Sequence, residues 1–186
     1  MKISTRSKLL LVGAAALVFA LDQASKFWVV RTLPPYTPVD VFPWLKPILS
    51  FTYITNMGVA FGLFPQLSTL LKFLPLLVIG LIVLFRRSIV VTRIWLDLAL
   101  GIVVGGALGN LWDRLFRGGA VVDFLDVNFW PFRQWPVFNL ADASILVGVG
   151  ILLLDSLLFD MQPAPIADVP TAPEAAFAPE DEGAHV

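Results

Sequence analysis

The chain has 186 residues, of which 58% are hydrophobic and 15% charged, and its net charge is −1. Soluble proteins average roughly 45–50% apolar and 25% charged residues, so this composition predicts a protein embedded in lipid. A net charge near zero provides no basic surface for nucleic acid, and we expect no nucleic-acid partner. The absence of cysteine excludes disulfides, thiol nucleophiles and thiolate metal sites.

The only histidine, His185, stands next to the end of a polar tail. A metal site would therefore lack a histidine ligand, and a Ser–His–Asp triad would lack its base. We expect neither a metal nor another cofactor. Proton chemistry is left to Asp, Glu, Lys and Tyr, and Asp dominates the apolar part of the chain.

Four stretches are apolar enough over about 20 residues to be membrane-spanning helices. They cover residues 9–30, 67–85, 94–112 and 140–159. The first stretch has an alternative reading as a cleaved signal peptide, because Lys2, Arg6 and Lys8 precede its apolar run. Its apolar character resumes after Asp22 and gives full spanning length, which favours a helix that stays in the protein.

Lysine and arginine predict the orientation, because they collect on the cytoplasmic side of a membrane protein. Clusters stand before the first span and between the second and third, at Lys2, Arg6, Lys8, Arg86, Arg87 and Arg93. We expect both termini in the cytoplasm and the connections 31–66 and 113–139 outside. Residues 1–159 then form one membrane domain, and the acidic, Pro-rich tail 160–186 is expected to be a disordered cytoplasmic extension.

The outer connection 31–66 contains the alternating, β-branched stretch 48–55, which predicts a short strand or hairpin on the membrane surface. The expected fold class is therefore a membrane all-α protein. It has four transmembrane helices and a small extracytoplasmic β-segment, a cradle or hairpin, between helices one and two.

Polar residues from three spans and one connection are expected at the same depth, near the outer face. A rise of about 1.5 Å per residue places Asp22 in the outer half of the first span. The group comprises Asp22, Asn110, Asp113, Arg114, Asp123, Asn139 and Asp142. A charge inside a span costs on the order of 3 kcal/mol, so such a gathering predicts a site. Asp97 and Asp155 belong to the inner ends, where snorkelling or pairing with Arg93 explains them.

Several of these residues also have structural explanations. Local ion pairing is favoured for Asp22 with Lys26 and for Asp113 with Arg117, which are four residues apart. Asn139 is a natural N-cap for the last helix. The glycines at 101, 105 and 109 form a ridge that lets another helix approach closely.

Asp142 is not explained by capping, because burying an acid between helices is costly for so small a gain. It lies in the first turn of the last helix, where the helix dipole favours the carboxylate. Asp123 and Asp142 together are the ingredients of an aspartic peptidase, in which two nearby carboxyl groups share one proton. One acid acts as base on a water while the other, protonated, polarises the scissile carbonyl. Asp123 is the expected holder of the proton.

Four motifs resemble the lipoprotein signal peptidase family, also called signal peptidase II. They are Asp22-Gln-Ala-Ser-Lys26, the stretch from Asn56 to Gly62, the stretch from Gly105 to Arg114 followed by Val121 to Asp126, and Phe138-Asn-Leu-Ala-Asp142. They occur in order across about residues 9–159, and together they are highly specific.

The resemblance implies a bacterial inner-membrane aspartic endopeptidase that removes signal peptides from diacylglyceryl-modified prolipoproteins, cutting before the lipidated cysteine. It implies that Asp123 and Asp142 are the catalytic pair. The implied substrate-binding residues are Asn56, Asn110, Arg114 and Asn139, and the supporting residues are Asp22, Lys26 and Asp113. The expected partners are the prolipoprotein and membrane lipids, and the chain is expected to be a monomer.

Three other protein classes remain as alternatives. An ion-coupled transporter would spread its acids along a path through the membrane, whereas these gather at one depth. A membrane phosphotransferase would need three or four acids at close helical repeats to hold a divalent metal. A purely structural membrane protein also buries acids.

Overall fold

The structure is a computed structural model, and it describes residues 5–46, 48–57, 77, 80, 93–132 and 135–159. Within these ranges, three helices are long and apolar enough to cross a membrane. They are α1 (Thr5–Thr32), α4 (Ile94–Phe116) and α5 (Leu140–Phe159). Apart from Leu77 and Gly80, the expected span 67–85 lies outside the described residues, as does the tail 160–186.

The three described spans confirm the predicted positions, with longer ends for two of them. The first begins four residues earlier than expected, and α4 continues to Phe116 rather than ending at residue 112. Asp113 and Arg114 therefore lie inside a helix and not in the connection that follows it.

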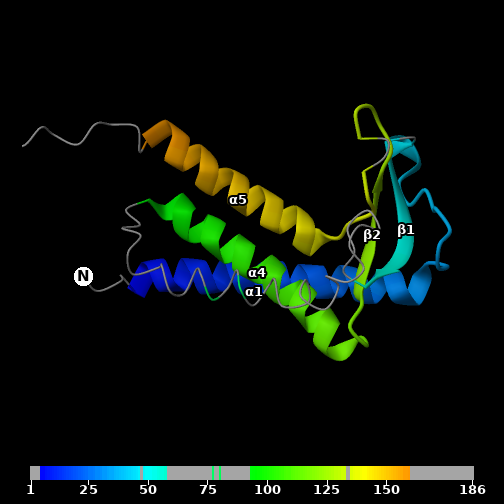
Figure 1. Ribbon diagram of the computed structural model, residues 1–186, viewed down its shortest axis with the longest axis horizontal. Helices are drawn as coiled ribbons and strands as arrows, with labels where there is room; N and C mark the ends of the chain where they lie inside the picture. Colours follow the sequence, from blue (N-terminus) through cyan, green and yellow to red (C-terminus); the bar gives the residue numbers. More distant parts are fainter. Residues whose placement is uncertain are drawn as a thin grey trace, which may run out of the picture.

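Helix α4 is the centre of the bundle, and it packs against both α1 and α5 (Figure 1). The glycine ridge on α4 makes the close approach to α1 possible. A Cβ atom on Gly105 would stand 2.6 Å from the backbone oxygen of Ala15, which no real side chain tolerates. The ridge is confirmed as a packing feature.

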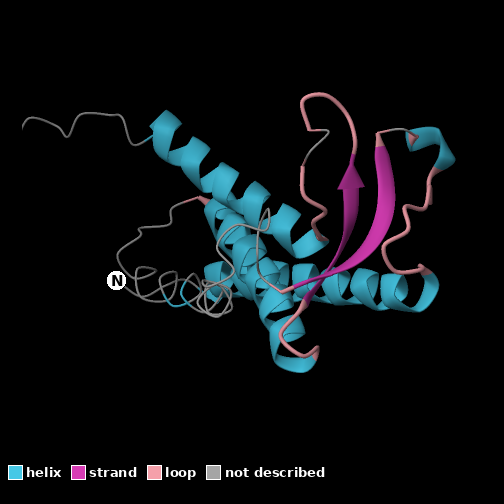
Figure 2. Ribbon diagram, turned by 45° about the vertical axis from the view of Figure 1, so that its right-hand side comes forward, coloured by secondary structure: helices cyan, strands magenta, loops and turns pink. Residues whose placement is uncertain are grey.

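Two strands, β1 (Leu49–Asn56) and β2 (Val121–Val127), form an antiparallel sheet at one end of the helices (Figure 2). We call this the sheet end. The opposite end, where α1 and α4 begin and α5 finishes, is the far end (Figure 1). A short 3₁₀ helix, Pro43–Leu45, precedes β1.

The strand expected within residues 48–55 is confirmed, but its partner corrects the prediction of a hairpin between helices one and two. β1 pairs with β2, which follows α4, and the register sets Ile54 opposite Asp123. The second strand was missed because its sequence, Val-Val-Asp-Phe-Leu-Asp-Val, alternates poorly: four consecutive side chains from Val121 to Phe124 are buried.

The sheet is held on the C-terminal part of α1 by a small apolar core. Val29 of α1 packs with Val122 and Phe124 of β2, and Phe51 of β1 covers them. Val29 shares a buried stripe of α1 with Asp22 and Lys26, since the three side chains fall on one helical face. One face of α1 therefore carries both Val29, which packs against β2, and the polar residues Asp22 and Lys26.

Candidate active site

The polar residues that were expected at one depth meet at the sheet end of the bundle. Hydrogen bonds and ion pairs join them across α1, α4, α5, β1 and β2. The members from the depth argument are Asp22, Asn110, Asp113, Arg114, Asp123, Asn139 and Asp142. Lys26 and Asn56, which the family resemblance implied, join them. The depth argument from sequence thus identified residues that lie in one connected cluster.

Asn139 and Asp142 form a reciprocal cap at the start of α5. The side-chain oxygen of Asn139 accepts the backbone N–H of Asp142 at 2.9 Å, and Asp142 Oδ2 accepts the backbone N–H of Asn139 at 3.2 Å. This is the capping-box arrangement, with Asn and Asp in place of Ser or Thr and Glu. The predicted N-cap is confirmed, and Asp142 has a capping role that the sequence did not reveal.

The cap also orients the amide of Asn139 toward the other acid. Because its oxygen accepts a backbone N–H, its Nδ2 must face the opposite way, where it donates to Asp123 Oδ1 at 2.6 Å. One side chain therefore contacts Asp123 directly and fixes the helix turn that carries Asp142. Asn139 is fully buried, so water does not compete for these bonds.

Asp123 projects from β2 and is only 2% exposed. Its second oxygen, Oδ2, accepts a hydrogen bond at 3.0 Å from the amide of Asn56, which ends β1. Burial, as the larger cause, and the nearby Asp142 together raise the pKa of Asp123 to about 7, while the Asn56 and Asn139 bonds oppose the shift. Such an acid retains its proton close to neutral pH.

Besides the backbone N–H of Asn139, Asp142 accepts a hydrogen bond from a side-chain amide on α4. Asn110 Nδ2 donates to Asp142 Oδ1 at 2.7 Å, while Asn110 Oδ1 accepts from Lys26 Nζ at 3.0 Å and from Asn139 Nδ2 at 3.1 Å. The two donors on its oxygen leave the amide nitrogen of Asn110 facing Asp142. Among the described residues, no lysine or arginine forms an ion pair with Asp123 or Asp142.

Local ion pairing, favoured for Asp22 and Asp113, is confirmed but incomplete. Lys26 pairs with Asp22 at 2.9 Å, and Arg117 pairs with Asp113 at 3.1 Å. Lys26 also reaches across to Asp113 at 3.0 Å, which helical spacing within one segment cannot predict. Local pairs on two helices are in this way joined into one buried network.

Arg114 lies beside the two acids with part of its donor capacity free. Its Nη1 donates to the backbone oxygen of Asn110, and its buried Nε has no hydrogen-bond partner within the described part of the chain. A buried N–H of this kind is a donor that an incoming polar group would satisfy.

Sequence reasoning missed two side chains that complete the cluster's support. Gln23 Nε2 donates toward Asp22 Oδ2, the Gly109 backbone oxygen and Asp113 Oδ1 at 3.1–3.2 Å. Thr52 of β1 donates to Asp126 of β2 at 2.7 Å. The sequence signal for Gln23 was its place beside Asp22 in the same motif. Thr52 had no such signal, because only the pairing of β1 with β2 brings it to Asp126.

The acids assigned to the inner ends lie at the far end, away from the cluster. Arg93 Nη1 pairs with Asp155 at 2.6 Å, as predicted, and Ser7 donates to Asp97 at 2.7 Å. The acids therefore do not trace a path through the bundle, which disfavours the transporter alternative. Across the described ranges, no three His, Cys, Asp or Glu side chains gather as ligands for a metal ion.

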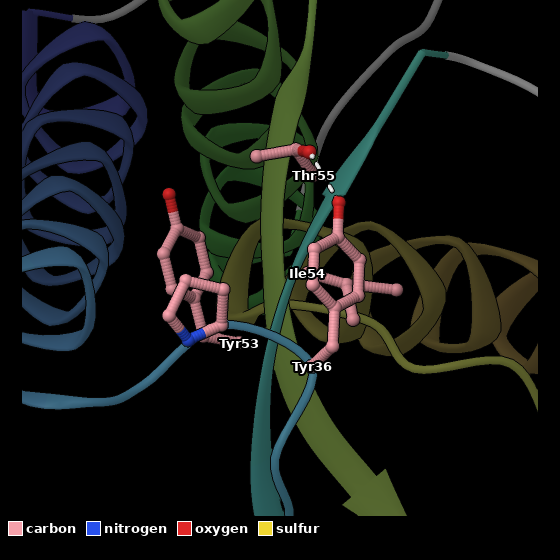
Figure 3. Close-up of a pocket in the computed structure, with 5 residues that line it drawn as sticks. Tyr36, Tyr53, Ile54 and Thr55 are labelled. Carbon is pink, nitrogen blue, oxygen red and sulfur yellow. Dashed lines mark hydrogen bonds between the residues drawn. The ribbon is translucent and has the colours of Figure 1, made fainter.

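A separate shallow pocket of about 200 Å³ lies on β1 (Figure 3). Its lining residues are Pro35, Tyr36, Tyr53, Ile54 and Thr55. The Tyr36 hydroxyl lies 3.4 Å from the hydroxyl of Thr55, and no acid lines the pocket. This pocket therefore contributes no carboxyl group to the cluster described above.

Comparisons with known proteins agree on one family. A family model described as signal peptidase (SPase) II matches residues 14–158. The lipoprotein signal peptidase of Shewanella piezotolerans is 40% identical over 149 residues, covering 76% of this chain and 82% of that protein. The one of Acaryochloris marina is 43% identical over 151 residues, covering 78% and 87%. A solved bacterial membrane enzyme aligns with a TM-score of 0.69 at 30% identity, covering 81% of this chain and 93% of that one.

Proposed function

The chain belongs to the lipoprotein signal peptidase family of aspartic membrane peptidases, and we propose that Asp123 and Asp142 are the catalytic pair with which it processes prolipoproteins. The observation that carries this assignment is the position of Asn139. Its amide holds Asp123, while the rest of the residue caps the turn that carries Asp142. The two acids are therefore fixed relative to one another by a single buried residue.

In the proposed reaction, Asp142 takes a proton from water as the water oxygen attacks the scissile carbonyl carbon. Protonated Asp123 donates a hydrogen bond to the carbonyl oxygen, and its pKa of about 7 supports this role. When the C–N bond breaks, Asp123 helps to protonate the leaving nitrogen, and the proton that Asp142 took from water remains as the one shared by the pair. Because Asp142 helps to raise the pKa of Asp123, the two roles are assigned to the pair as one unit.

The other site residues surround this pair. We assign Asn56, Asn110, Arg114 and Asn139 to binding the substrate or positioning the acids, and Asp22, Lys26 and Asp113 to supporting them. The strongest support for a direct substrate contact is at Arg114, whose buried Nε has no partner among the described residues. A peptide carbonyl of the substrate would satisfy that donor.

For the membrane topology, we propose four spans, with 67–85 as the second. Both termini lie in the cytoplasm of a bacterial cell whose inner membrane holds the protein. The start of α1 and the finish of α5 lie at the same end of the bundle, which supports this arrangement (Figure 1). The sheet end then lies near the outer face, where water reaches the acids and a lipidated substrate presents its scissile bond.

The substrate we propose is a diacylglyceryl-modified prolipoprotein, cut just before its lipidated cysteine by a monomeric enzyme. The test is cleavage of a lipidated lipobox peptide and of its unlipidated twin by purified protein in detergent. Cleavage of the lipidated peptide alone is expected. Equal cleavage of both peptides would reject the lipid requirement.

The metal-dependent alternative has a separate test. We expect a chelator to leave cleavage of the lipidated peptide unchanged, because the proposed steps use only carboxyl groups and water. A loss of activity that a divalent ion restores would favour a metal site instead.

A further inference from the structure

Lys26, Asp22 and Asp113 form a fully buried ionic triad, each 0% exposed, at the centre of the sheet end. Lys26 Nζ lies 2.9 Å from Asp22 Oδ2 and 3.0 Å from Asp113 Oδ2. Burying three charges is expensive, and apolar side chains of the same volume would often give equal or greater stability. Stability alone is therefore a weak reason for this arrangement.

Each acid of the triad also accepts a hydrogen bond from the backbone N–H of the residue that precedes one proposed catalytic residue. Asp22 Oδ1 accepts the N–H of Ala141, the residue before Asp142, at 3.0 Å. Asp113 Oδ2 accepts the N–H of Val122, the residue before Asp123, at 3.1 Å. Lys26 joins these two acids, so one ammonium group links the backbones that carry both catalytic carboxyl groups.

Lys26 has a third contact that reaches a catalytic side chain. It donates to Asn110 Oδ1 at 3.0 Å, and the same amide donates to Asp142 at 2.7 Å. We propose that the Lys26–Asp22–Asp113 triad is a clamp that sets the spacing and orientation of the catalytic pair, and that Lys26 is a positioning residue for peptide hydrolysis. This inference rests on the proposed function of Asp123 and Asp142.

The close approach of α1 and α4 at this point is part of the clamp. A Cβ atom on Gly109 would collide with the carboxylate of Asp22. Only glycine leaves room for Asp22 to lie against α4 and reach Ala141 at the start of α5. The clamp therefore uses residues from three helices and one strand, all joined at Lys26.

The test compares turnover with substrate binding. Lys26→Met alone leaves Asp22 buried without a cation and Asp113 with Arg117 as its remaining partner, which risks misfolding. Two charge-balanced pairs therefore accompany it: Asp22→Asn with Lys26→Met, and Asp113→Asn with Lys26→Met. Asparagine retains an oxygen that accepts the Ala141 or Val122 N–H. The matched control is Lys46→Met, which removes an exposed lysine that pairs with Asp40 at 2.7 Å.

The measurements are kcat on a lipidated lipobox peptide and the dissociation constant of a non-cleavable analogue. Loss of the clamp should reduce kcat by about 100-fold, because misplacement of reacting groups by about 1 Å has that effect, while the dissociation constant changes less than about threefold. The Lys46→Met control should match the wild type.

An unchanged kcat in either charge-balanced pair would overturn the proposal. Loss of binding and turnover together in both pairs would also overturn it, because the triad would then only hold the fold. Asp142→Asn is measured in parallel. If that variant cleaves normally, the catalytic assignment fails, and that failure is separate from any result at Lys26.

Discussion

The far end and the sheet end of the bundle both contain buried acids, but they are neutralised in different ways. At the far end, Asp155 pairs with Arg93 at 2.6 Å and accepts a second bond from Trp95 at 2.9 Å. At the sheet end, Asp123 and Asp142 accept hydrogen bonds from asparagine amides and form no ion pair among the described residues. Two cations of the sheet end, Lys26 and Arg117, pair instead with the other acids, Asp22 and Asp113.

The difference shows how a membrane protein can bury an acid without fixing its protonation state. A carboxylate in contact with a guanidinium is strongly biased toward the charged form. A carboxyl group held by amides is oriented but retains access to both forms, which proton transfer requires. In our proposal, the Lys26–Asp22–Asp113 triad supplies rigidity next to the two acids that would exchange protons.

The largest expected effect comes from comparing two single substitutions, one of an acid near each end of α5. Asp142→Asn should lower the cleavage rate of a lipidated lipobox peptide by about 100- to 10,000-fold, because the base is lost. Asp155→Asn, in the same helix, should leave the rate near that of the wild type. Equal losses in both variants, measured on folded protein, would erase the distinction between the two ends.

The pH dependence should show a smaller effect. Asp123 has a pKa of about 7, raised by burial and by Asp142, and it acts as an acid only while protonated. Asp123 is therefore almost fully protonated well below pH 7, and its protonated fraction falls about tenfold for each pH unit above 7. We expect kcat/KM to decline as pH rises through about 7, reversibly on return to pH 6. A rate that stays flat to pH 9 would contradict this assignment.

The smallest expected effect concerns packing between the two ends. Gly105→Ala places a Cβ atom 2.6 Å from the backbone oxygen of Ala15, so α1 must shift. The free energy of unfolding should fall by about 1–3 kcal/mol. Gly150→Ala is the control, since its Cβ atom meets nothing within 4 Å. Thermal unfolding in detergent measures both, and equal melting temperatures would argue against the glycine ridge.

Much of the described fold was predictable from hydropathy. The three described spans and the shared depth of Asp22, Asn110 and Asp142 follow from helix length and rise, which are fixed by geometry. The pairing of β1 with β2 was not predictable, because β2 follows a helix that the expected hairpin left out. Its buried run, from Val121 to Phe124, also lacks the alternation that marks a half-buried strand.

The members of the polar cluster were predictable as a set of residues, but their network was not. Spacing of four residues identified the Asp22–Lys26 pair, yet the contact from Lys26 to Asp113 depends on how α1 meets α4. The same is true of Asn139, which sequence identified as a cap. Its contact with Asp123 exists only because β2 lies beside the start of α5.

The most direct test of the catalytic pair is the turnover of two matched variants on one strand. Asp123 and Asp126 both lie in β2, but Asp123 accepts the Asn139 amide and Asp126 accepts the Thr52 hydroxyl. At saturating lipidated peptide, Asp123→Asn should abolish measurable cleavage while Asp126→Asn retains most of it. Near-normal turnover by a folded Asp123→Asn variant would contradict the central claim.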